Sequence, residues 1–193
     1  IGEDGPYMAL AVQSGAMSVA TLKRLWPITM MPPARAWVIE HVVDGRIEGG
    51  RATVSLRPPA FDVEDDAPGW SGDDVQVDIA FSDLSLSTVG TVPVAQGLSG
   101  RIQVADEVLT ITSPSGVMVA RPGEQIAISD TVFQVPDIRE SGDKTGVLKL
   151  TANGPAKSLA TLLDAEPFTV LTRNDLAPDD VAGSGEMTLN ATF

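Results

Sequence analysis

The sequence contains no cysteine and a single histidine, His41, among its 193 residues. Without cysteine the chain cannot form disulfides, thiolate nucleophiles, cysteine-ligated zinc sites or iron–sulfur clusters. One histidine likewise excludes a metal site built from several imidazoles. We therefore expect no metal site and no cofactor of these kinds.

Basic residues are also scarce. Thirteen Lys and Arg against 26 Asp and Glu give a formal charge of −13, with a pI near 4.3. Such a field repels nucleic-acid phosphates, and it also opposes adsorption to anionic membrane surfaces. The closest basic pair is Lys23-Arg24, and no larger basic cluster exists. We expect no nucleic-acid partner.

Long hydrophobic runs are missing as well. No continuous apolar run reaches the ~18 residues that a membrane-spanning helix needs. The chain opens Ile1-Gly2-Glu3-Asp4, without an initiator methionine and acidic where a secretory signal would be basic. We therefore expect a fragment of a longer protein, with any signal or membrane anchor outside it. No linker divides the sequence, which predicts a single module over residues 1–193.

What the sequence does contain is a period of two. Val75, Val77, Ile79 and Phe81 alternate with polar or small residues, the pattern of a half-buried strand. The same alternation recurs at residues 7–12, 52–56, 84–87, 101–104, 108–112, 117–119, 125–128, 132–135, 147–150 and 185–193. Turn signals at short intervals, such as those at residues 49–50, 97–100, 113–116 and 122–123, separate these runs. The pattern predicts a mainly β protein with an antiparallel architecture: a sandwich, a barrel or a rolled sheet.

Three short segments have helical spacing instead. They are residues 19–25, residues 34–43 with Asp44-Gly45 as the expected stop, and a segment opened by Gly154-Pro155. Trp26 and Trp37 are predicted to anchor the core. Three short helices cannot cover a sheet of about ten strands, so something else must cover its apolar face.

Candidate catalytic and ion-binding residues are few. His41 has no positioned nucleophile and no Gly-x-Ser-x-Gly elbow, so we predict no enzymatic activity. Acidic clusters at residues 64–66, 73–74 and 179–180 lack the alternating spacing of a calcium loop, and solvated loop charge is the favoured interpretation. A calcium-dependent or carbohydrate-binding domain remains a third hypothesis.

Several motifs of the sequence are not generic. The first are Leu22-Lys23-Arg24-Leu25-Trp26-Pro27, Pro33-Ala34-Arg35-Ala36-Trp37-Val38 and Asp44-Gly45-Arg46-Ile47. Later blocks are Phe81-Ser82-Asp83-Leu84-Ser85-Leu86, Val92-Pro93-Val94, Gly97-Leu98-Ser99-Gly100-Arg101-Ile102, the run from Gly154-Pro155 to Pro167-Phe168, and Gly183-Ser184-Gly185. Together these motifs, which span residues 18–193, resemble one family, the AsmA-like, YhdP-type proteins of Gram-negative envelopes.

The resemblance implies a segment of a long periplasmic protein tethered to the inner membrane. Family members resemble bridge-like lipid transporters with an elongated, curled β-sheet and a hydrophobic groove, and they are implicated in moving phospholipid towards the outer membrane. No enzymatic activity or cofactor is implied. The expected partners are phospholipid acyl chains, neighbouring modules of the same chain and envelope proteins.

On this hypothesis the apolar strand faces line the groove. The candidate lipid-binding residues are Val75, Val77, Ile79, Phe81, Ile102, Val104, Ile126, Ile128, Met187 and Leu189. The alternative is a structural or protein-interaction module in which two apolar faces cover each other and no ligand binds. The residue pattern leaves both open.

Overall fold

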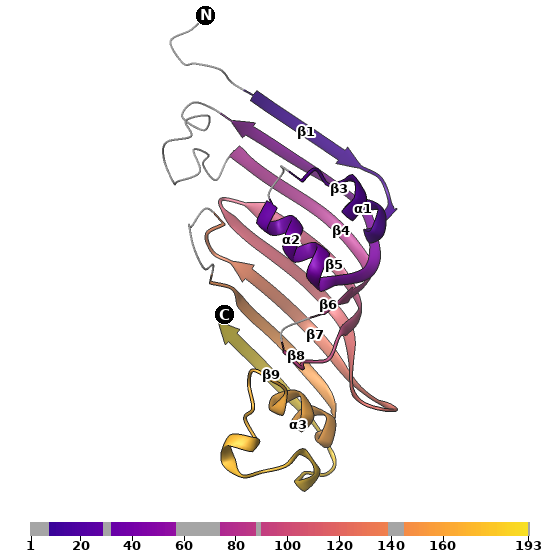
Figure 1. Ribbon diagram of the computed structural model, residues 1–193, viewed down its shortest axis with the longest axis vertical. Coiled ribbons are helices and arrows are strands. Elements are labelled where there is room, and N and C mark those ends of the chain that lie inside the picture. The colour runs from indigo at the N-terminus through magenta and orange to yellow at the C-terminus, as the bar shows by residue number, and fades with distance from the viewer. Residues whose placement is uncertain (1–7, 29–31, 57–73, 88–89, 139–144, 193) are drawn as a thin grey trace, which may run out of the picture.

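A single open sheet forms the body of the molecule (Figure 1). The structure, a computed structural model, describes residues 8–28, 32–56, 74–87, 90–138 and 145–192. Its strands are β1 (Met8–Ser14), β2 (Met17–Ser18), β3 (Val42–Leu56), β4 (Val75–Leu86), β5 (Ala95–Ala105), β6 (Val108–Arg121), β7 (Glu124–Val135), β8 (Val147–Pro155) and β9 (Ser184–Thr192).

The strands follow one another as an antiparallel meander. Their order across the sheet is β1-β3-β4-β5-β6-β7-β8-β9, and the short β2 pairs with β3 beside β1. Figure 1 shows β1 and β9 at opposite edges of the sheet. The predicted mainly β, open antiparallel architecture is therefore confirmed. Within the described residues a single sheet is present, so the sandwich-like version of the prediction does not apply.

Three helices accompany the sheet, as predicted. They are α1 (Val19–Leu25), α2 (Pro32–His41) and α3 (Ala156–Asp164), followed by the short 3₁₀ turns η2 (Thr172–Asn174) and η3 (Pro178–Asp180). The helix α1 begins where the Ser18 hydroxyl accepts a hydrogen bond from the Thr21 backbone N–H and so caps the helix.

Several predicted turns proved wrong because they lie inside long strands. Asp44-Gly45, expected to stop the second helix, belongs to β3, and α2 ends earlier, at His41. The Gly and Ser residues at 97–100 and 113–116 lie within β5 and β6, where the pairing register shifts between Gln96 and Arg101. Glycine and serine here accommodate β-bulges, which use the same residue types as turns. The acidic residues 64–66 and 73, interpreted from the sequence as solvated loop charge, lie outside the described residues.

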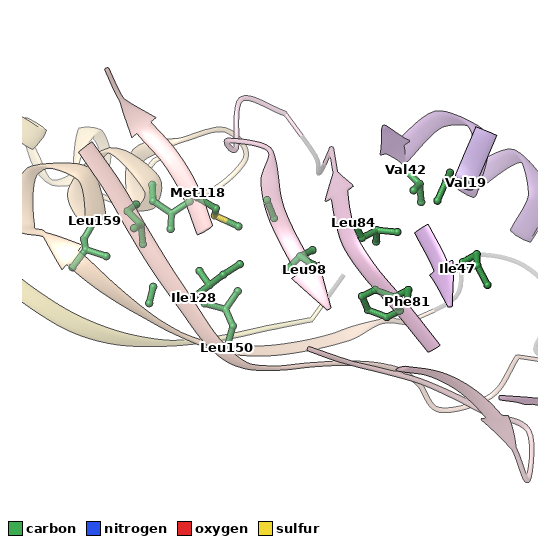
Figure 2. Packing of buried hydrophobic residues seen from close by; sticks show 14 residues of the cluster. Val19, Val42, Ile47, Phe81, Leu84, Leu98, Met118, Ile128, Leu150 and Leu159 are labelled. Carbon is green, nitrogen blue, oxygen red and sulfur yellow. The ribbon is translucent and has the colours of Figure 1, made fainter. Parts of the chain in front are cut away.

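The hydrophobic core lies between the helices and one face of the sheet. Figure 2 shows side chains from the helices and the strands meeting on one side of the sheet. The buried cluster comprises Val19, Val42, Ile47, Phe81, Leu84, Ala95, Leu98, Met118, Ile126, Ile128, Leu150, Ala152, Leu159 and Leu162. The helices thus use the apolar strand face that the alternation predicts.

Gly45 is required where β3 meets the end of β4. Its φ is +138°, and a Cβ atom built there would lie 2.8 Å from the Cα atom of Leu84. Side chains are strained in such a conformation, and the nearest atom is backbone that cannot rotate away.

We therefore predict that Gly45→Ala destabilises the protein by roughly 1–3 kcal/mol, the cost of a strained backbone position. Gly15 is the matched control, because a Cβ atom there meets nothing within 4 Å. Chemical denaturation of Gly45→Ala and Gly15→Ala measures both changes. Equal stability of the two variants would contradict the assignment.

Candidate functional site: the open end of an apolar sheet face

The two ends of the strands differ in what covers the apolar face. The helices α1 and α2 precede the start of β3, and α3 follows the end of β8 directly. Buried helix residues Val19, Leu159 and Leu162 pack with strand residues from this same end, including Phe81 and Ile128. We call this the helix end of the sheet, and the opposite strand ends the open end.

A row of large apolar side chains crosses the sheet towards the open end. Cross-strand pairing places Ile79 opposite Ile102, Ile102 opposite Ile111, Ile111 opposite Phe133, and Phe133 opposite Leu148. Each of these five side chains is half-buried. We name these five residues the isoleucine row, and residues directly opposite one another in neighbouring strands present their side chains on the same face.

A second row lies two residues further along each strand. It runs through Val77, Val104, Leu109 and Val135, and extends to Ala52 on β3. Val104 and Val135 are buried, whereas Val77 and Leu109 are half-buried. Together the two rows make a broad apolar surface at the open end, because a spacing of two keeps side chains on one face.

The ten residues predicted to bind lipid divide into two groups. Phe81, Ile126 and Ile128 belong to the core cluster at the helix end, where protein atoms already surround them. The other seven lie on the same face: Val75 and Val104 are buried, and Val77, Ile79, Ile102, Met187 and Leu189 are half-buried. The latter five are the predicted residues with surface left to offer a ligand.

Sequence reasoning missed three members of the isoleucine row. Ile111, Phe133 and Leu148 lie in runs recognised as strands, and they alternate with Thr110, Gln134 and Lys149. The same alternation that selected Ile79 would have found them. The register between strands, which the sequence pattern does not give, is what shows that they continue one row.

The residues of the family-like motif hold the helix pair together. The Arg35 side chain donates a hydrogen bond from Nε to the Trp26 carbonyl at 3.1 Å, which ties α2 to the end of α1. Trp26 caps α1, Pro27 follows it, and Ala34 is half-buried on α2. The motif therefore explains local structure, and nothing in its geometry implies chemistry.

The prediction that Trp37 anchors the core is wrong. Its side chain is 42% exposed, and the centre of its ring lies 5.0 Å from that of the His41 ring. Val38 beside it packs against the core instead. The helix turns its Val38 side to the sheet, so Trp37 falls on a flank. Trp26 is half-buried.

Polar contacts fix the segment that follows α3. The Asp179 carboxylate accepts a hydrogen bond from Arg121 at 2.8 Å, with Lys157 at 3.5 Å, so that η3 is attached to β6 and α3. The hydrogen bond and charge of Arg121 lower the pKa of Asp179. Hydrogen bonds from the Thr172 backbone and hydroxyl lower the pKa of Asp164 in the same way. These carboxylates act as structural acceptors.

A small cavity of about 280 Å³ lies beside α3. Its lining consists of Thr91, Pro93, Ala120, Thr161, Asp164, Ala165 and Pro178. This volume falls just below the range of ~300–1,000 Å³ that small-molecule sites usually occupy. The carboxylate in its wall already accepts two hydrogen bonds from Thr172. The cavity is a less favourable candidate site than the apolar face.

In the described ranges no group of three or more His, Asp or Glu side chains is placed to hold a metal ion. None of the helices described is long and apolar enough to cross a membrane. Comparison with protein-family models, curated proteins and solved structures found no match to the chain. The site is therefore interpreted from its own geometry.

The division between helix end and open end predicts a contrast between two similar substitutions. Ile126 is 0% exposed, so Ile126→Ala should leave a cavity and cost about 2–5 kcal/mol of unfolding free energy. Ile102 is half-buried at the open end, so Ile102→Ala should cost about 1 kcal/mol. Urea denaturation measures both. Equal losses would mean that the open end is as fully packed as the helix end.

Proposed function

We propose that the chain is a non-enzymatic module that binds phospholipid acyl chains on the open end of its apolar sheet face. The observation that carries this proposal is the isoleucine row, five half-buried apolar side chains from five adjacent strands. An apolar surface of this kind on a single sheet gains free energy when it is covered.

An acyl chain suits this surface on physical grounds. Hydrophobic contact is non-directional, and each buried methylene contributes about 0.8 kcal/mol whether its neighbours are protein or lipid. The two rows offer apolar side chains with few polar groups, so they provide no directional recognition of a polar substrate. A flexible hydrocarbon is the occupant that such a surface favours.

The AsmA-like resemblance of the sequence supports the cellular part of the proposal. On this proposal the module belongs to a periplasmic protein that is tethered to the inner membrane, serves phospholipid transport between the inner and outer membranes and so maintains envelope integrity. The open antiparallel sheet is consistent with the curled sheet of that family.

A charge placed in the isoleucine row tests lipid binding. Ile79→Asp, or Val77→Asp in the neighbouring row, should abolish lipid retention, because a carboxylate beside an acyl chain loses its hydration. Ala80→Asp is the matched control, since residue 80 is adjacent and belongs to the opposite face. Native mass spectrometry with organic extraction measures phospholipid bound to each purified protein.

The expected result is near-stoichiometric phospholipid on the wild type and on Ala80→Asp, and none on Ile79→Asp. Thermal unfolding of each variant verifies that it is folded. A folded Ile79→Asp protein that keeps its lipid would refute the site. A wild type that stays lipid-free after incubation with phospholipid would instead favour the alternative, a structural or protein-interaction module that binds no ligand.

Neighbouring modules are the second class of partner that we propose. The strands β1 and β9 each pair on one side only within the described sheet. From β1 to β9 the sheet holds eight antiparallel strands in a row, so β1 and β9 run in opposite directions. Strand β1 of a second module placed beside β9 would therefore be antiparallel to it. Met8 pairs with Leu56, and Thr192 pairs with Val147, so both residues lie at the open end of the sheet. A connection of hairpin length would therefore join β9 of one module to β1 of the next.

A tandem protein tests this pairing. Two copies of the chain joined head to tail should unfold at a temperature several degrees above the single chain, because a β9–β1 interface would stabilise both. Fusion to an unrelated folded domain provides the control. Calorimetry that finds both copies unfolding at the single-chain temperature would show that these edges do not pair.

A further inference from the structure

The two edge strands of the sheet have few of the features that usually protect a sheet edge. Strands β1 and β9 pair with their inner neighbours without a register shift over their whole length. Strand β1 contains no proline and no charged residue, and β9 contains no proline and one charged residue, Glu186. Edge strands are commonly shielded by lysine, proline or a bulge, because their outer backbone groups attract another strand. Both edges are therefore suited to pairing with a further strand.

The apolar sheet face is uncovered where it reaches the β1 edge. Leu10 is 41% exposed and Val12 is 47% exposed, although their pairing with β3 places them on the same face as the buried Val75. At the other edge, Met187 and Leu189 of β9 are half-buried on this face. Apolar side chains on directly opposite strands contact one another, so a strand added beside β1 would cover its exposed pair. Strand β9 of a second copy of the chain offers apolar side chains at the matching spacing of two.

Two conditions select one register for a joint between β9 of one copy and β1 of the next. Strand β1 spans seven residues and β9 spans nine, so all of β1 can pair only where Met8 lies opposite residue 190, 191 or 192. A shift by one residue turns every side chain of a strand to the other face. The first and third registers therefore set apolar Leu10 opposite Thr188 or Asn190. Only the middle register keeps the apolar residues of both strands on one face, and it sets Leu10 opposite Leu189.

We infer, on the basis of the module contact proposed above, that separate copies of the chain join β9 to β1 in this middle register and form open-ended assemblies. On the apolar face, Met187 then lies opposite Val12 of the next copy. On the opposite face, Thr188 lies opposite Ala11. A head-to-tail contact between two different edges leaves one edge free at each end, so the assembly grows as the protein concentration rises. The face that carries the isoleucine row thereby continues from one copy into the next.

Disulfide crosslinking of the full chain tests the register, because the sequence contains no cysteine of its own. The test variant is Thr188→Cys with Ala11→Cys, both at exposed positions on the face opposite to the acyl-binding surface. Directly opposite residues of antiparallel strands have Cα atoms about 4.5–5.5 Å apart, within the span of a disulfide, whereas diagonal neighbours are about 7–8 Å apart. The matched controls combine Thr188→Cys with Ala9→Cys or with Gln13→Cys, which fit registers shifted by two residues.

Mild oxidation should convert the test variant into a ladder of covalent dimers, trimers and longer species at least ~10-fold faster than either control, because only directly opposite thiols are within reach. A control that crosslinks as fast as the test variant would overturn the register. Rapid dimer formation by Thr188→Cys alone or by Ala11→Cys alone would show that like edges pair, which also overturns it.

Sedimentation of the unmodified chain measures assembly without crosslinking, and the average mass should rise with protein concentration. A chain that stays monomeric while the tandem protein is stabilised would overturn the assembly of separate copies and leave the module contact standing. Phospholipid retention by native mass spectrometry should be unchanged in the test variant, because both substitutions lie on the opposite face. Failure of assembly is thereby distinguished from failure of acyl binding.

Discussion

The structure depends on one requirement, that an apolar sheet face be kept from water. The meander has a single such face, and the helices α1, α2 and α3 cover it at one end of the strands. The side chains of Ile126, Phe81 and Val19 are buried at this end, while the open end combines buried Val75, Val104 and Val135 with the half-buried isoleucine row. On our proposal, folding and lipid binding use two parts of the same sheet face, divided along the strands.

The two rows at the open end are built from apolar side chains. The residues of the two rows are aliphatic or aromatic, and they can exclude water without orienting a substrate. The carboxylates with a lowered pKa, Asp164 and Asp179, accept hydrogen bonds that attach the segment after α3. These two carboxylates therefore hold the segment after α3 in place. The function that we propose depends instead on apolar contact.

Local alternation was sufficient to predict the fold class and the apolar face, because a half-buried strand such as β4 requires period two. It could not predict register or length. Gly and Ser at residues 113–116 have the composition of a turn, yet they lie within β6, where the register of the pairing with β5 shifts. Which of the candidate residues are buried also depends on helices that are distant in the sequence. Ile126 and Ile102 lie in similar strand patterns, yet Ile126 is buried in the cluster that includes α3, whereas Ile102 is only half-buried. The exposure of Trp37 had no sequence signal.

The most direct test of the account is photo-crosslinking with a phospholipid that carries a diazirine near the end of one acyl chain, followed by peptide mapping. The account predicts adducts at the open end of the apolar face, on peptides containing Ile102, Ile111 and Phe133. Adducts confined to the opposite face of the sheet, or none on a folded protein incubated with the lipid, would contradict it.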